Sequence, residues 1–288
     1  MTLVLGPRGL DLSLCNSDPD FAAIKAAGVE FVYHRATCGT APDSAFQRRR
    51  AAARKVGLRW GSYGVLKPGD NALAQATAFI AAVGALEATD LPCFIDLESA
   101  GDRPDDAEAW CCHVDEAFER ETGVYSYGPF LVSLKLATDH PLRARWLWLA
   151  DYEVTPHSPP GWRQPTLWQA FGDVGVPSIA EAFGPTGING AHLDGGGTKI
   201  DRDYFNGSLS ELVAWIASTS RAQMPPASAA ATGPASPLRV ETDDQGLPTP
   251  AATPSAKSSQ RMAAVRAEIV DDAPTTQRSA VTSFDGET

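Results

Sequence analysis

Apolar strand-like runs alternate with helix-like segments over roughly the first 216 of the 288 residues, and this alternation restricts the possible folds more than any other feature. Strands are expected at 9–14, 30–37, 58–66, 91–98 and 124–127, and helices at 18–27, 43–56, 69–83, 105–121 and 129–136. Such units pair their strands in parallel through right-handed crossovers. Three strands with little helix between them follow at 146–152, 166–171 and 198–204, before a closing helix at 209–216. The pattern predicts an α/β fold, an irregular TIM-like (β/α)5β3 barrel.

The last part of the chain differs sharply in composition. Residues 219–288 are rich in Ala, Pro, Ser and Thr and contain almost no aromatic side chains. Such a segment buries too little apolar surface to offset the entropy lost on ordering, so we expect it to be disordered. Within it, residues 258–271 have apolar side chains at helical spacing and could form a transient helix. The predicted domains are therefore a barrel over 1–218 and a disordered tail over 219–288.

Composition excludes several classes of function. The formal net charge of -11 argues against a nucleic acid partner, since phosphate binding needs a basic surface. No apolar run is long enough to insert into a membrane, and the first residues lack the features of a signal peptide, so synthesis in the cytoplasm is expected. The five cysteines and five histidines do not have metal-ligand or disulfide-framework spacing. We therefore expect reduced thiols, no metal and no cofactor.

Acidic side chains are concentrated where the strands of the predicted barrel end. Side chains alternate along a strand, so Asp96 and Glu98 share one face at the C-terminal end of the strand over 91–98. Asp11 ends the first strand and Asp201 lies on the last, and closure of a barrel would make these two neighbours. Active sites of such barrels lie at the C-terminal ends of the strands. Like charges in one pocket raise at least one carboxyl pKa, which is what glycoside hydrolysis by an acid and a carboxylate requires.

The chain also resembles the family 25 glycoside hydrolases, the lysozyme-type muramidases. The resemblance rests on six motifs in order between about Gly9 and Gly207. They are Gly9-Leu10-Asp11-Leu12-Ser13, Arg35-Ala36-Thr37-Cys38-Gly39, Gly61-Ser62-Tyr63-Gly64, Asp96-Leu97-Glu98, the two strands with Trp148-Leu149-Ala150-Asp151-Tyr152 and Leu167-Trp168-Gln169, and Asp201-Arg202-Asp203-Tyr204-Phe205-Asn206-Gly207. The resemblance implies an eight-stranded barrel that hydrolyses the β-1,4 bond between N-acetylmuramic acid and N-acetylglucosamine in peptidoglycan glycan strands.

Roles for individual residues follow from the resemblance. Glu98 would be the general acid, and Asp96 would stabilise the oxocarbenium-like transition state or orient the acetamido group of the substrate. Asp11 and Asp201 would be supporting acids. The expected substrate-binding residues are Tyr63, Tyr127, Trp148, Tyr152, Trp168 and Asp203.

The chain departs from the family pattern at three positions near these motifs. Cys38 stands where the family usually has Glu, and Gly64 where it usually has His; both are expected near the pocket. Asp203 replaces an Asn and adds an acid. The proposed acid Glu98 and its partner Asp96 are present, so these departures are expected to change substrate preference or rate rather than abolish catalysis.

Several alternatives stay open at this stage. Asp96 and Glu98 could form a structural ion pair with a base such as Arg35. Asp11 could cap the loop that follows it, and aromatic side chains on strands are often core residues. The main alternative function is a catalytically impaired barrel that binds wall sugars or a partner protein. As an enzyme, the chain is expected to be an endolysin-like phage or prophage product that acts on the bacterial cell wall, released on lysis or carried on the virion. Its tail is a candidate tether to an unknown protein partner.

Overall fold

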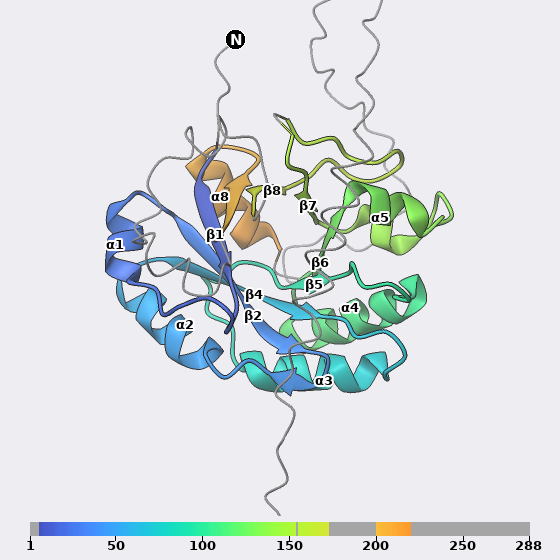
Figure 1. The fold of residues 1–288 in the computed structure, drawn as a ribbon, viewed down its shortest axis with the longest axis horizontal. Helices are drawn as coiled ribbons and strands as arrows, with labels where there is room; N and C mark the ends of the chain where they lie inside the picture. The colour runs from blue at the N-terminus through green and yellow to red at the C-terminus, as the bar shows by residue number, and fades with distance from the viewer. Residues whose placement is uncertain (1–5, 154, 173–199, 220–288) are drawn as a thin grey trace, which may run out of the picture. The chain divides into compact units, whose positions relative to one another are not determined.

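Eight strands close into a barrel in the computed structural model, which describes residues 6–153, 155–172 and 200–219 (Figure 1). The neighbours run in the order β1-β9-β8-β7-β6-β5-β4-β2, and pairing of β1 with β2 closes the ring. The strands are β1 (Arg8–Leu12), β2 (Phe31–Cys38), β4 (Arg59–Val65), β5 (Phe94–Asp96), β6 (Gly123–Tyr127), β7 (Leu147–Ala150), β8 (Leu167–Phe171) and β9 (Asp201–Phe205). A short β3 (Ala41–Pro42) pairs with the end of β2.

Five helices connect the first six strands of the barrel in sequence, which confirms the predicted (β/α)5β3 arrangement. They are α1 (Phe21–Ala26), α2 (Phe46–Lys55), α3 (Ala72–Val83), α4 (Pro104–Phe118) and α5 (Gly128–Ser133). Figure 1 shows α1 to α4 in an arc around one side of the strands. A 3-10 turn, η1 (Pro141–Ala144), precedes β7, and α8 (Leu209–Ser218) follows β9.

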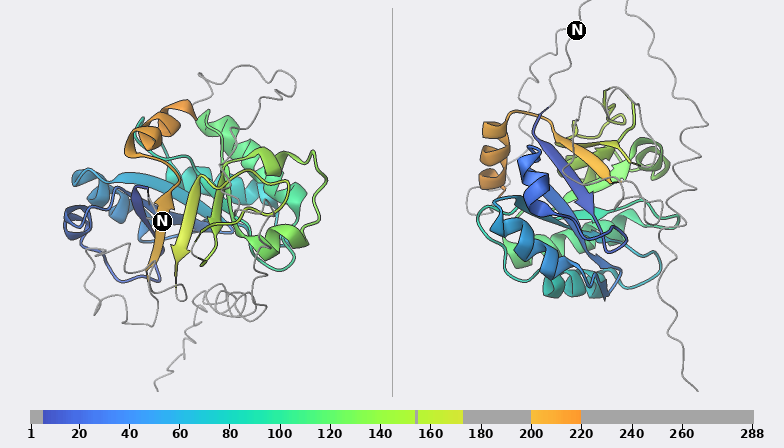
Figure 2. Two further views of the ribbon diagram at one scale, coloured as in Figure 1. Left: turned by 90° about the horizontal axis from the view of Figure 1, so that it is seen from above. Right: turned by 60° about the vertical axis from the view of Figure 1, so that its left-hand side comes forward.

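The last strand runs opposite to the others. The neighbouring strands from β1 through β8 pair in parallel. By contrast, β9 is antiparallel to both of its neighbours, β8 and β1 (Figure 2). The expectation of parallel pairing therefore holds for seven strands of the barrel and not for the eighth. Because β9 is reversed, its first residue lies at the end of the barrel where the parallel strands finish. This end is called the mouth below.

The two faces of each strand pack into two separate cores. Ile95 and Leu97 belong to the core between the strands and the helices, whereas Phe94 belongs to the core inside the barrel. Inward glycines make room for the aromatic rings of this inner core. An added Cβ would lie 2.0 Å from the Phe31 ring at Gly9, 2.2 Å from Tyr33 at Gly61 and 2.1 Å from Phe94 at Gly123. The interior is thus closely packed below the mouth, as in other barrels of this kind.

Much of the tail lies outside the described residues. The proposed boundary near residue 218 coincides with the end of α8, but all of the tail beyond Thr219, including the expected helix at 258–271, is not described. Within the described ranges, no helix has the length and apolar character needed to cross a membrane.

Because the inward glycines lie against aromatic rings, adding one methyl group is expected to lower the free energy of unfolding at these positions and not at glycines with open space around them. Gly61→Ala places a carbon against the Tyr33 ring and is expected to lower the free energy of unfolding by about 1–3 kcal/mol, the usual cost of overpacking a core. Gly128→Ala is the matched control, because its added carbon meets nothing closer than 3.8 Å. Urea denaturation of both variants checks this, and equal midpoints would contradict the proposed packing.

Candidate functional site

The chain that leaves β5 carries the two acids of the Asp96-Leu97-Glu98 motif to the mouth. Asp96 is the last residue of β5 and is buried. The pairing continues past the strand, because Leu97 N donates to Tyr125 O at 3.0 Å and Ser126 Oγ donates to Leu97 O at 2.6 Å. Since Leu97 packs outward, Asp96 faces the interior of the barrel, and strand alternation directs the half-buried Glu98 to the same side.

Asp11 and Asp201 lie side by side at the mouth, as the sequence predicted. They are paired residues in the antiparallel register of β1 and β9. The hydroxyl of Tyr63, on β4, donates to Leu12 O at 3.3 Å. Burial raises the pKa of Tyr63 well above its ordinary value, and the charges of Asp11, Asp96 and Asp201 raise it further. Because the charges of Asp11, Asp96 and Asp201 all act on the Tyr63 hydroxyl, these acids from three strands lie around a common space.

Gln169, on β8, connects this group by three hydrogen bonds. Its Nε2 donates to Asp11 Oδ2 at 2.8 Å, and its Oε1 accepts from Tyr125 Oη at 3.0 Å and Tyr152 Oη at 2.9 Å. These contacts fix the amide orientation and give Asp11 a neutral donor. From the sequence, Gln169 is part of a motif with no role of its own. The signal for its role is its inward position on a strand predicted to line an acidic pocket.

Asp203 lies one layer below the mouth and is fully buried. Its Oδ1 accepts a hydrogen bond from Trp148 Nε1 at 2.8 Å. Burial raises the pKa of Asp203 well above the usual 3.8, and the charges of Asp11 and Asp201 add to the rise. Burial is the larger cause, and the like charges expected from the sequence add to it. A protonated Asp203 carboxyl can donate and accept hydrogen bonds, as the Asn of the family motif would.

The proposed aromatic contacts divide into two groups. Trp148 is 1% exposed, and Trp168 packs outside the barrel with its ring 5.7 Å from Tyr204. Both are therefore core residues, the alternative left open by the sequence. Tyr63, Tyr127 and Tyr152 are half-buried and stay candidates for contact with sugars. Asp203, with no exposed surface, is likewise a supporting residue rather than a sugar contact.

The end of β8 brings Tyr152 close to Asp201. A Cβ added to Gly172 would lie 2.6 Å from both Asp201 Oδ1 and Tyr152 Oη. The absence of a side chain at position 172 therefore leaves room for these two polar groups to approach each other. Together with the Gln169 contact, this places Tyr152 at the same side of the mouth as Asp201.

Asp43 holds both Arg35 and the loop after β1. Its carboxylate pairs with Arg35, whose Nε donates to Oδ2 at 3.3 Å. Asp43 Oδ2 also accepts from Leu14 N at 2.8 Å and thereby holds the loop after β1. Asp11 itself bonds across the barrel to Gln169. Asp43 could not be identified from the sequence, because Leu14 lies 29 residues away from it along the chain.

The departures Cys38 and Gly64 lie on different faces of the barrel wall. Cys38 pairs with Val65, which pairs with Asp96, so the half-buried Cys38 belongs to the inward row of the mouth as expected. Gly64 does not. An added Cβ there would lie 2.9 Å from the Phe79 ring and 3.0 Å from Trp110, because alternation turns residue 64 outward when Tyr63 points inward. Position 64 therefore faces the helices and not the pocket near which it was expected.

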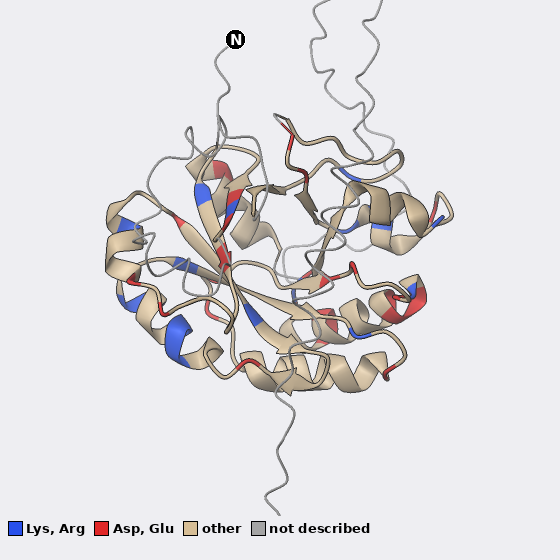
Figure 3. Ribbon diagram, viewed as in Figure 1, with Lys and Arg blue, Asp and Glu red and all other residues tan. Residues whose placement is uncertain are grey.

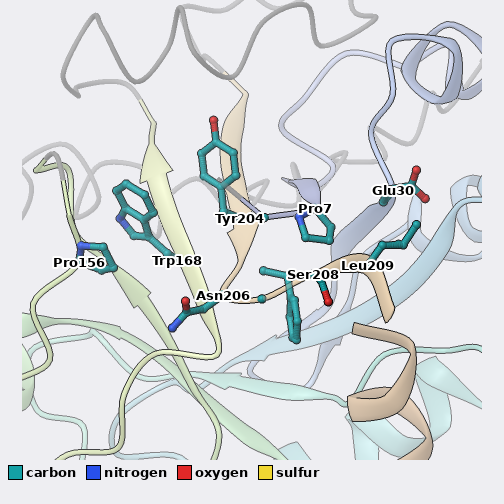
Figure 4. Close-up of a pocket in the computed structure, with 11 residues that line it drawn as sticks. Pro7, Glu30, Pro156, Trp168, Tyr204, Asn206, Ser208 and Leu209 are labelled. Carbon is teal, nitrogen blue, oxygen red and sulfur yellow. The ribbon is translucent and has the colours of Figure 1, made fainter. Parts of the chain in front are cut away.

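A separate hollow of about 670 Å³ lies at the opposite end of the barrel (Figure 4). It is lined by Gly6, Pro7, Glu30, Pro156, Trp168, Tyr204, Phe205, Asn206, Gly207, Ser208 and Leu209. Residues before β1 and after β9 form much of this lining, whereas the acids lie where β1 ends and β9 begins. The hollow is therefore not part of the acid cluster.

Charge is distributed unevenly over the described residues. Figure 3 shows acidic positions along the central strands and basic positions concentrated on α2. Among the described residues, no group of three or more His, Cys, Asp or Glu side chains is arranged to hold a metal ion. The chemistry available at the mouth is therefore that of carboxyl groups, phenols and an amide.

Comparison with known proteins identifies a matching family. The profile described as Glycosyl hydrolases family 25 matches residues 10–177, more than half of the chain. An autolytic lysozyme of Clostridium acetobutylicum is 35% identical over 92 residues, which cover 32% of this chain and 28% of that protein. Lysozyme M1 of Streptomyces globisporus is 24% identical over 233 residues, covering 75% of this chain and 73% of that protein.

A solved structure agrees with the sequence matches. The structure of a muramidase from Trichobolus zukalii superposes with a TM-score of 0.60 at 25% identity, covering 74% of this chain and 100% of that chain. The fold is therefore shared with that muramidase over its full length.

The buried Asp203 predicts a characteristic dependence of stability on pH. The pKa of Asp203 is higher in the folded protein than the 3.8 of a free side chain. Its contribution to the free energy of unfolding is therefore fully present below about pH 3.8 and is lost as the pH rises through the folded-state pKa. Asp203→Asn cannot ionise, so it is expected to match the wild type near pH 4 and to be increasingly more stable towards neutral pH. Chemical denaturation at a series of pH values tests this, and parallel stability curves would show that Asp203 is ionised in the folded protein.

Proposed function

Because the chain belongs to glycosyl hydrolases family 25, we propose that it cleaves the β-1,4 bond between N-acetylmuramic acid and N-acetylglucosamine in peptidoglycan. The observation that carries this proposal is the pair Asp96 and Glu98 at the end of β5, in a mouth shared with Asp11, Tyr63 and Asp201. Most glycoside hydrolases use a pair of carboxyl groups in different environments. The lysozymes and the muramidase among its relatives support the same substrate class.

In the proposed reaction, Glu98 acts as the general acid. It transfers its proton to the glycosidic oxygen while the bond from that oxygen to the anomeric carbon breaks, and the bonding electron pair leaves with the oxygen. Positive charge develops on the sugar ring, where the carboxylate of Asp96 stabilises it or orients the acetamido group. Water then adds to the anomeric carbon, and one of its protons returns to the carboxylate of Glu98.

Supporting roles are assigned to the groups around this pair. Asp11 is held by Gln169 and lies beside Asp201, so both carboxyls have fixed positions at the wall of the mouth. Tyr63, Tyr127 and Tyr152 are half-buried, and such rings can pack against the apolar faces of sugars while their hydroxyl groups bond to polar neighbours. We assign these three side chains to binding of the glycan strand.

The route to the wall stays a prediction from the sequence. Endolysin-like release during phage lysis, or carriage on a virion, would bring the enzyme to peptidoglycan. The tail over 219–288 remains the candidate tether to a protein partner. The function proposed for the barrel does not depend on either point.

Release of reducing ends from purified peptidoglycan tests the proposed function. Glu98→Gln is expected to lower the rate by about 10²–10⁴-fold, because the amide cannot supply the proton, while binding to peptidoglycan is retained. Glu121→Gln is the matched control. Glu121 is also half-buried but precedes β6 at the other end of the barrel, so this variant should keep full activity.

Two results would contradict the proposal. Equal rates for the wild type and Glu98→Gln would remove Glu98 as the acid. A wild type that releases no reducing ends from several peptidoglycan types, yet sediments with them, would instead support a sugar-binding barrel without hydrolytic activity.

A further inference from the structure

A buried arginine on α2 holds the loop that follows β1. The Arg49 side chain is 3% exposed, and its Nη1 and Nη2 donate to Ser13 O and Asn16 O, both at 2.6 Å. Its Nε and Nη2 also donate to Asp18 Oδ1, at 3.3 and 3.1 Å. In addition, Nη1 lies 3.2 Å from His34 Nε2. All five N–H groups of the guanidinium therefore have acceptors, and His34 provides the acceptor that lies outside the loop.

This acceptor exists only while His34 is neutral. The His34 side chain has no exposed surface, and its Nδ1 lies 2.8 Å from Arg35 O. A carbonyl oxygen can only accept, so Nδ1 carries the ring proton and Nε2 is left to accept from Arg49. A second proton, added at Nε2, would remove the acceptor and place a positive ring beside the guanidinium at 3.2 Å.

The surroundings of His34 favour its neutral form. The pKa of His34 is lowered from 6.5 to about 4, mainly by burial and also by the charges of Arg49 and Arg35. The charge of Asp43, in the segment before α2, and the hydrogen bond to the Arg35 carbonyl oppose this change. From β4, the uncharged ring of Trp60 stacks on the imidazole with 5.5 Å between centroids. Exposure of His34 to water would return its pKa towards the ordinary value, so acid favours any state in which the ring is hydrated.

The loop held by Arg49 borders the mouth. Ser13, whose carbonyl accepts from Arg49, directly follows β1, and Asp11 lies on β1 two residues before it. Between them, Leu12 O accepts from the Tyr63 hydroxyl at 3.3 Å. A shift of Ser13 would therefore move the end of the strand that carries Asp11 and contacts Tyr63.

We propose that Arg49 positions the mouth by holding the loop after β1, and that protonation of His34 releases this hold in acid. The inference rests on the proposed function, because the mouth is the site of that reaction. Arg49 acts through the backbone of the loop and is a positioning residue. When His34 is protonated, the guanidinium is displaced, Ser13 O and Asn16 O lose their donor, and the loop separates from α2.

Hydrogen exchange of the Leu14 amide, followed by NMR at a series of pH values, tests this release in the full-length chain. Leu14 N donates to Asp43 Oδ2 at 2.8 Å and is protected while the loop is held. With a His34 pKa of about 4 in the held loop and 6.5 in the released loop, its protection factor is expected to fall about twentyfold from about pH 7 to about pH 5.

An amide across the barrel is the internal control for this measurement. Val124 N donates to Trp146 O at 2.8 Å, far along the ring of strands from β1. Its protection factor should change little over the same pH range. A constant protection factor at Leu14, or an equal fall at Leu14 and Val124, would overturn the proposal.

His34→Gln removes the titration but keeps an oxygen that can accept from Arg49. The protection factor of the Leu14 amide is therefore expected to be independent of pH in this variant. His140→Gln is the matched control, because His140 precedes η1 and its Nδ1 accepts from Leu142 N at 3.3 Å. This control should keep the fall seen in the wild type. If His34→Gln does not fold, the comparison of Leu14 and Val124 in the wild type still decides the question.

Arg49→Lys tests the positioning of the mouth. A lysine has one nitrogen with three N–H groups and cannot replace the bonds to Ser13, Asn16 and Asp18 together. The kcat/KM for peptidoglycan is expected to fall about tenfold near neutral pH, because the end of β1 is no longer fixed. Arg48→Lys is the matched control, since Arg48 is 62% exposed and pairs with the same Asp18 at 2.7 Å. This variant should keep full activity.

The two measurements separate this proposal from the proposed function. A folded Arg49→Lys that loses Leu14 protection but keeps the kcat/KM of the wild type would reduce Arg49 to a structural residue and overturn the positioning role. Exchange needs no turnover, so acid release of the loop in a wild type that produces no reducing ends would overturn the proposed function alone. A Leu14 amide that ignores pH in an active enzyme would overturn only the role of His34 and Arg49.

Discussion

Packing around the Trp148 ring supports the whole mouth of the barrel. Its ring centroid lies 4.7 Å from that of Tyr33, 4.8 Å from Tyr125 and 5.6 Å from Phe94, and its N–H donates to Asp203. These rings fill the barrel to its centre, and the inward glycines provide the space that they need. Because this floor excludes water, the groups directly above it interact through a medium of low polarity, where charges and hydrogen bonds have larger effects.

The acids at the mouth coexist because neutral groups are placed among them. Gln169 supplies a neutral amide donor to Asp11, and burial raises the pKa of Asp203, which favours its protonated form. In that form, neither group adds negative charge to the mouth. The remaining carboxylates border the open mouth, where a sugar with developing positive charge would be stabilised. The packed floor thus strengthens the electrostatic stabilisation that the carboxylates of the mouth can provide.

The sequence predicted the barrel because its strands and helices alternate clearly, and barrel closure alone predicted that Asp11 and Asp201 are neighbours. Strand alternation, applied consistently, would also have turned Gly64 outward, since Tyr63 beside it points inward. Other features depend on three-dimensional packing. The depth of Asp203 below the mouth and the three hydrogen bonds of Gln169 join strands far apart in the chain, and no local pattern reports them.

The most direct test of this catalytic assignment is a crystal structure of Glu98→Gln with a bound peptidoglycan fragment. We expect a glycosidic oxygen to lie at hydrogen-bond distance, about 2.6–3.2 Å, from the substituted side chain, with Asp96 facing the adjacent sugar. A glycan bound instead in the hollow beside Trp168 and Tyr204, with the mouth empty, would contradict the assignment of the mouth as the catalytic site.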